Sequence, residues 1–70
     1  MVKFAQVEAG QVVQLGRFYK EMSKHSGKQA LVVEKQVAKI GKNVYTAILV
    51  QVGPRERVLV ALHNIKEVLA

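Results

Sequence analysis

The sequence predicts an all-β domain, a small five-stranded antiparallel barrel with a short helical turn near the C-terminus. Three observations predict it. Valine-rich segments alternate with the period of a strand, glycines separate these segments at strand-length intervals, and the chain contains a single proline. Half of the 70 residues are apolar, which is typical of a folded chain. Residues 1–70 are therefore interpreted as one domain.

The first half of the chain is predicted to hold three strands. Residues 11–15 and 18–23 form a hairpin that reverses at Gly16, because glycine reaches positive φ without steric cost. The polar stretch 24–28 is interpreted as a loop. Residues 30–39 are predicted as a bent strand, since the branched Cβ of valine favours a pleated surface. Apolar residues at helical spacing leave an amphipathic helix as the alternative for this segment.

The second half carries the strongest strand pattern. A turn, a long strand, a loop and a fifth strand are predicted at residues 41–43, 44–52, 53–56 and 57–62. Pro54 favours a loop because proline cannot donate to a strand ladder. Asn64 is predicted to cap a single helical turn with Glu67 three residues later, so that the apolar residues Ile65, Val68 and Leu69 close the core.

The two long C-terminal strands carry apolar side chains on both faces. Alternation along 44–52 places Val44, Ile48, Val50 and Val52 on one face and Tyr45, Ala47 and Leu49 on the other. A small barrel has one interior, so the second apolar face needs a cover. Either the N-terminal segment around Phe4 and Val7 lies over it, or a second copy of the chain does, which predicts a homodimer.

Positive charge is concentrated in the middle of the chain. Of the net charge of +6, residues 17–42 supply five, through seven basic and two acidic side chains. Such clustering is typical of polyanion binding. The candidates for phosphate contacts are Arg17, Lys20, Lys24, Lys28, Lys35, Lys39 and Lys42. A single binding stripe requires Lys20, Lys35 and Lys39 to share one face with the flanking loops.

Aromatic residues near these cations suggest how bases are held. Tyr19 and Tyr45 are candidates for stacking on exposed bases, a contact worth about 1–3 kcal/mol per base in single strands. The alternative is that Phe18 or Tyr19 fills the core and the lysines merely solvate a sheet edge. We expect binding to a nucleic-acid backbone, DNA or RNA, without sequence specificity.

A protein-interaction module is the alternative function. Exposed strand edges are extended by a partner's strand, and arginine and tyrosine commonly anchor interfaces. The candidate partner-interface residues are Tyr45, Leu49, Arg55, Arg57 and Leu59. In this interpretation the chain binds a host protein and inhibits or redirects it.

Catalysis is not predicted. The chain has no cysteine and no aspartate, and its two histidines, His25 and His63, have no carboxylate at short spacing. No catalytic residue, metal ligand or cofactor is therefore assigned. No apolar run approaches the roughly 20 residues that span a bilayer, and the start lacks an apolar signal region. A cytoplasmic protein without a membrane partner is expected.

The opening of the chain resembles small uncharacterised bacteriophage proteins. The resemblance lies in residues 4–13 and in the following Gly16, Tyr19-Lys20, Ser23 and Ala30. Gln6 and Ala9 stand where that pattern has aspartate and proline. The resemblance implies no activity, and it implies action in a host bacterial cytoplasm.

A second resemblance extends further along the chain. The basic loop 24–28 ahead of Val32-Val33, two long strands and a closing turn at 61–65 resemble SH3-like barrels of the KOW and Tudor kind. The second glycine of the KOW loop is replaced by Gln29-Ala30. The resemblance implies an SH3-like barrel whose basic loop contacts RNA, DNA or polymerase.

Overall fold

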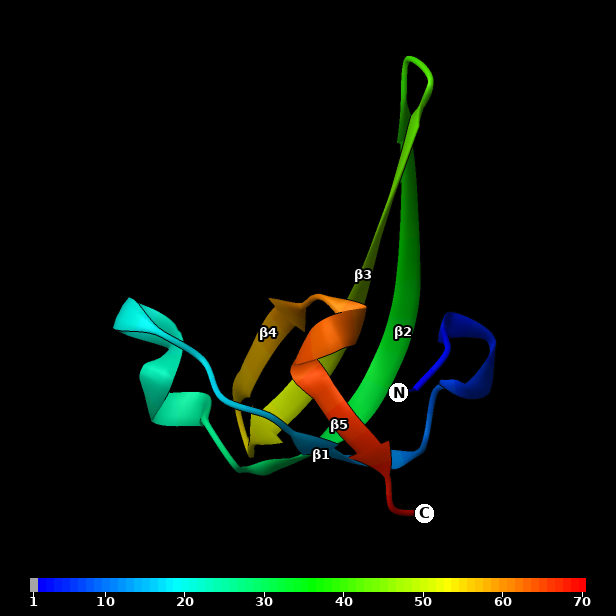
Figure 1. The fold of residues 1–70 in the computed structure, drawn as a ribbon. Helices are drawn as coiled ribbons and strands as arrows, with labels where there is room; N and C mark the ends of the chain where they lie inside the picture. Colours follow the sequence, from blue (N-terminus) through cyan, green and yellow to red (C-terminus); the bar gives the residue numbers. More distant parts are fainter. Residues whose placement is uncertain (1) are drawn as a thin grey trace.

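Five antiparallel strands form a single sheet in the computed structural model, which describes residues 2–70 apart from the side chain of Met22. The strands are β1 (Val12–Leu15), β2 (Gln29–Ile40), β3 (Asn43–Gly53), β4 (Glu56–Val60) and β5 (Ile65–Val68). They lie in the order β4-β3-β2-β1-β5, with β4 and β5 at the two edges (Figure 1). Three short 3-10 helices complete the fold: η1 (Phe4–Gln6), η2 (Lys20–His25) and η3 (Leu62–Asn64). The predicted all-β class is confirmed, with five antiparallel strands and a helical turn near the C-terminus. The predicted closure into a barrel is not seen in the described residues, because the edge strands β4 and β5 do not pair.

The segment 30–39, for which strand and helix were alternatives, is a strand. Its pairing with β3 shifts between Val32 and Glu34, which leaves Val33 as a bulge. A bulge bends its strand and strengthens the local twist. Before the bulge, residues Gln29–Leu31 of β2 pair with β1. On its other edge β2 pairs with β3 along nearly its whole length, from Leu31 to Ile40.

The predicted strand over 18–23 is wrong. Phe18 lies in an irregular segment, and residues from Lys20 onward form η2. The reason is tertiary: the Phe18 N–H donates to Ser26 Oγ (2.8 Å), and the Ser26 hydroxyl donates to the Phe18 carbonyl oxygen (3.2 Å). These bonds occupy the backbone groups that a hairpin with residues 11–15 would use. Lys20 has φ +57°, which also ends the extended conformation.

The predicted helical turn capped by Asn64 is displaced. The turn η3 comes earlier, and residues 65–68 form the edge strand β5 against β1. Asn64 Oδ1 accepts a hydrogen bond from the Ala61 N–H (3.1 Å), so this side chain faces backward along the chain. Ile65 is buried as expected, whereas Leu69 remains exposed.

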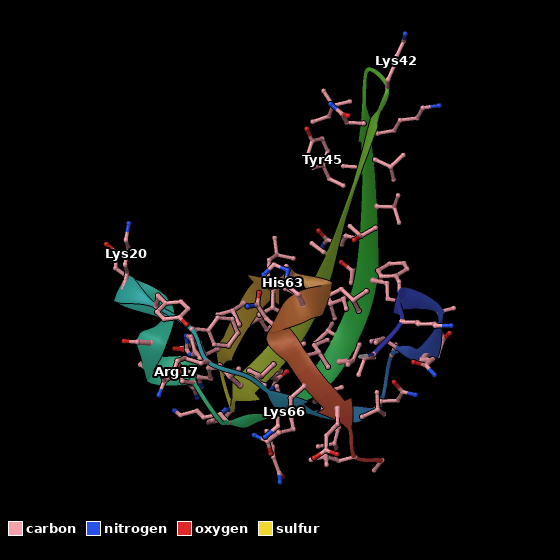
Figure 2. All side chains as sticks on the ribbon, viewed as in Figure 1. Arg17, Lys20, Lys42, Tyr45, His63 and Lys66 are labelled. Carbon is pink, nitrogen blue, oxygen red and sulfur yellow. The ribbon has the colours of Figure 1, made fainter. Side chains whose placement is uncertain are left out.

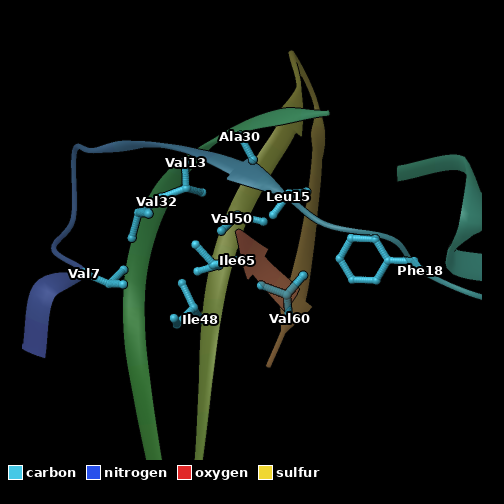
Figure 3. Close-up of a cluster of buried hydrophobic side chains, with 10 residues drawn as sticks. All are labelled: Val7, Val13, Leu15, Phe18, Ala30, Val32, Ile48, Val50, Val60 and Ile65. Atoms are coloured by element: carbon cyan, nitrogen blue, oxygen red, sulfur yellow. The ribbon is translucent and has the colours of Figure 1, made fainter. Parts of the chain in front are cut away.

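The inner face of the bent sheet holds the core. Ile48 and Val50 are fully buried on it and pack with residues of every strand (Figure 3). The cluster consists of Val7, Val13, Leu15, Phe18, Ala30, Val32, Ile48, Val50, Val60 and Ile65. Phe18 is therefore a core residue, as one of the sequence interpretations held.

The N-terminal segment covers the inner face and not the outer one. Val7 is fully buried in the core cluster. Lys35 pairs directly with Ile48 and so shares its face. The ammonium of Lys35 lies 3.4 Å from the Phe4 carbonyl oxygen and 4.8 Å from the centre of the Phe4 ring. The interpretation that this segment lies over the outer face is wrong, and Leu31 and Leu59 remain exposed there.

The β2–β3 hairpin extends beyond the rest of the sheet. β1 pairs with β2 only from Gln29 to Leu31, and β4 pairs with β3 only from Ile48 onward. Residues 36–47, called the arm below, are therefore a two-stranded ribbon that projects from the sheet (Figure 1). Gly41, at φ +61°, makes the turn at its tip, which suits glycine because this conformation strains other residues.

Candidate nucleic-acid interface

The seven predicted cationic residues fall on two separate projections of the fold. Arg17, Lys20, Lys24 and Lys28 belong to the loop between β1 and β2, residues 16–28, called the basic loop below. Lys39 and Lys42 lie on the arm, and Lys35 lies at its base. Figure 2 shows Lys20 at the outer end of the basic loop and Lys42 at the tip of the arm, on different projections. The structure groups the four loop residues and separates them from the arm.

Hydrogen bonds close the base of the basic loop. The Gly27 N–H donates to the Gly16 carbonyl oxygen (3.1 Å), and Gln14 Nε2 donates to the Gly27 carbonyl oxygen (2.7 Å). The two hydrogen bonds between Ser26 and Phe18 connect the two ends of the loop one step farther from the sheet. The buried Phe18 ring anchors the loop to the core. The loop is thus held at its root while its cationic side chains point into solvent.

A buried histidine connects the basic loop to the first residue of β4. His25 is only 2% exposed, and its Nε2 lies 3.3 Å from Oε1 of Glu56. Lys24 lies 4.0 Å from the other oxygen of the same carboxylate. Sequence spacing did not reveal this contact, because Glu56 follows His25 by half the length of the chain. Among the described residues, His25 Nδ1 has no hydrogen-bond partner.

An open groove runs along one side of the basic loop. Its volume is about 510 Å³, and it is lined by Gln14, Leu15, Gly16, Arg17, Ser26, Gly27 and Lys66. Lys66 comes from β5 and joins Arg17 across the groove, although the two are far apart in sequence. Lys66 was not among the predicted cations, which were those of the basic stretch 17–42.

Most cations of the groove and of the basic loop have no acidic partner. Within residues 2–70, no carboxylate lies within 4.0 Å of the side-chain nitrogens of Arg17 and Lys66 in the groove, or of Lys20 and Lys28 on the loop. Lys35 differs, because its ammonium contacts Glu8 Oε1 at 3.4 Å and its side chain is half-buried. The Lys35 ammonium therefore already binds the N-terminal segment. Arg17 and Lys66, which have no acidic partner, are free to bind an external anion.

The two tyrosines lie on different projections. Tyr19 is 74% exposed and directly precedes Lys20 on the basic loop. Tyr45 is 54% exposed on the arm, where its cross-strand partner is the small Ala38. Tyr19 is thus the aromatic residue that the fold places with the loop cations.

Within residues 2–70, no group of three or more His, Cys, Asp or Glu side chains is placed to hold a metal ion. In the same part of the chain, no helix is long and apolar enough to cross a bilayer. Comparison of the sequence and structure with protein-family models, curated proteins and solved structures found no match.

Most of the predicted partner-interface residues share the outer face of the sheet. Leu49 pairs directly with Leu59, and Tyr45 and Arg57 fall on the same face by alternation. Arg55 lies in the turn that precedes β4. Leu59 is 53% exposed, so the outer face of β3 and β4 presents apolar surface to solvent.

Proposed function

We propose that this protein binds the backbone of a nucleic acid, without sequence specificity, through the basic loop and its groove. The observation that carries the proposal is that Arg17 and Lys66, from distant parts of the chain, line one groove without a carboxylate partner. Lys20, Lys24 and Lys28 extend this positive surface along the loop. Cations that neutralise phosphates release condensed counterions, and that release supplies most of the affinity in nonspecific binding.

Single-stranded DNA or RNA suits this surface best. The exposed Tyr19 ring offers a stacking face beside Lys20, and stacking tolerates any base because every base has a π-face. Lysine and arginine on a loop read charge along the backbone and not the pattern of base edges. The role that follows is coating or bridging of nucleic acid by a small all-β protein in a bacterial host, in line with the resemblance to bacteriophage proteins.

Fluorescence anisotropy with single-stranded DNA, duplex DNA and RNA across a salt series tests the proposal. With about five phosphates contacted, the slope of log affinity against log salt is expected near −4 to −5 for a duplex and shallower for a single strand. A flat salt dependence on all three probes would eliminate nucleic acid as the ligand.

A matched pair of charge reversals locates the site. The double substitution Arg17→Glu and Lys66→Glu is expected to weaken binding at least tenfold, with the salt slope shallower by about two. Lys39→Glu with Lys42→Glu changes the net charge equally, but on the arm, and is expected to weaken binding much less. Equal losses in the two double variants would show that overall charge, and not the groove, determines affinity.

A second candidate function is the binding of a host protein, which the exposed outer face of β3 and β4 favours. Leu49, Leu59 and Arg57 present an apolar patch with one cation beside it, a composition common in interfaces. A pull-down from bacterial lysate with and without nuclease separates the two functions. Partners retained after nuclease treatment and lost in Leu59→Lys support this function, whereas partners lost with nuclease were tethered by nucleic acid.

A further inference from the structure

Both edges of the arm are unpaired, one on β2 and one on β3. Along Asn43–Ala47, β3 has β2 on one side only, because β4 begins its pairing at Ile48. The backbone groups on the other side of this segment therefore have no strand partner. Unpaired strand edges are templates for another strand, and proteins ordinarily blunt them with charges, prolines or bulges. The free edge at Asn43–Ala47 has none of these features.

The arm also exposes apolar side chains on both faces. Val37 and Val44 lie on one face, and Ile40 and Tyr45 lie on the other. Each of these four side chains is more than half exposed. A two-stranded ribbon alone is marginally stable in water, and four exposed large apolar side chains add a cost. A partner strand along the free edge would bond its backbone groups and cover part of the Val44 and Tyr45 side chains.

We infer that this partner is a second copy of the chain, whose own Asn43–Ala47 pairs antiparallel with this one about a two-fold axis near Tyr45. The segment is self-complementary: it is uncharged, and its β-branched and aromatic residues favour cross-strand pairs. Antiparallel pairing places each Tyr45 beside the other, where aromatic rings make favourable contacts. Two-fold pairs of this isologous kind are the commonest dimer interfaces.

The positions of the lysines favour this edge over pairing of the opposite edge about Val37. With Tyr45 near the two-fold axis, the two copies of Lys42 lie about 20 Å apart along the strand direction, because each is three residues from the axis. That separation exceeds the screening length of about 8–10 Å at ordinary salt. Pairing through the β2 edge about Val37 would instead set Lys35 of one copy opposite Lys39 of the other, and directly opposed like charges destabilise a sheet.

The dimer does not depend on the proposed function. Figure 2 shows Arg17 and Lys66 at the end of the molecule away from Lys42 and the tip of the arm. Pairing of the arms therefore leaves both grooves open. Two grooves on one particle bind a polyanion bivalently, which raises avidity when both engage one strand.

Sedimentation of the full chain from micromolar to millimolar concentration tests the inference, together with cysteine cross-linking. The chain has no cysteine, so Tyr45→Cys introduces a single thiol. Opposed residues of an antiparallel pair have Cα atoms about 4.5–5.5 Å apart, within the range of a disulfide. We expect a dimer mass and rapid disulfide formation by Tyr45→Cys. The control Val37→Cys, on the other strand of the arm, is expected to cross-link at least tenfold more slowly.

Charge substitutions test the inference independently of cross-linking. Tyr45→Lys opposes two like charges at the axis and is expected to shift the mass to that of a monomer, whereas Val37→Lys keeps the dimer. A monomer mass for the unsubstituted chain over the whole concentration range overturns the inference. Faster cross-linking by Val37→Cys than by Tyr45→Cys also overturns it.

Discussion

Truncation of Ile48 tests whether the sheet has one core face. Ile48 is fully buried at the centre of β3, between Lys35 of β2 and Val60 of β4. Leu59 lies on the opposite face and is 53% exposed. The two residues are neighbours in space and similar in size, so Ile48→Ala and Leu59→Ala compare the two faces with little change in chemistry.

The expected losses of unfolding free energy differ severalfold between the two variants. Ile48→Ala removes buried methyl groups and leaves a cavity, which costs about 2–5 kcal/mol of unfolding free energy. A domain of this size has about 3–5 kcal/mol in total, so the variant is expected to be largely unfolded at 37 °C. Leu59→Ala removes surface that is already half in water and should cost less than about 1 kcal/mol.

Urea denaturation followed by circular dichroism measures both values. For a domain of this length each kcal/mol also shifts the melting temperature by about 4–8 °C, so thermal melts provide a second readout. Similar losses in Ile48→Ala and Leu59→Ala would refute the argument, because the outer face would then be as well covered in solution as the core. The comparison is made at low chain concentration, so that association does not stabilise either variant.

Two further predictions concern residues of the basic loop. His25→Leu is expected to be neutral or to stabilise the fold by about 1 kcal/mol in urea denaturation, because it removes a buried nitrogen without a partner, whereas His25→Ala leaves a cavity and costs about 2–4 kcal/mol. A large loss in His25→Leu would show that the contact with Glu56 outweighs that desolvation. Lys20→Gly is expected to leave the melting temperature unchanged or higher, since a side chain at φ +57° costs about 1–2 kcal/mol, whereas Lys39→Gly in β2 costs about 0.5–1 kcal/mol. A lower melting temperature for Lys20→Gly than for Lys39→Gly would contradict the strain at Lys20.

Strands with a period of two were predictable, and segments set by distant contacts were not. Alternation along 44–52 predicted β3 and placed Ile48 and Val50 on one face, which the structure buries. Both faces of this segment are apolar, so the sequence did not decide which of them is the inner one. The strand at 18–23 was predicted as the second half of a hairpin that reverses at Gly16. In the structure, Phe18 is instead held by the Ser26 hydroxyl and by the core, which local preference cannot anticipate.

The candidate site was predictable in composition and not in geometry. The cations of the basic loop stand out in the sequence, but Lys66 joins them only because β5 pairs with β1. The pattern of Asn64 followed by Glu67 is typical of a capping box, and here the Asn64 side chain bonds to the preceding Ala61 instead. The pairing of His25 with Glu56 likewise arises from the folding of β3 and β4 and leaves no local signal.

The regular ladder of the arm makes its length adjustable in steps of two. From Glu34 opposite Leu49 to Ile40 opposite Asn43, every residue of β2 has one partner on β3. Adding two residues to each strand would carry the turn at Gly41 about 7 Å farther out and keep each existing side chain on its face. Adding one residue to each would exchange the faces of everything beyond the insertion, including Val44 and Tyr45. Related chains with longer or shorter arms are therefore expected to differ by even numbers of residues per strand, with the core below the arm unchanged.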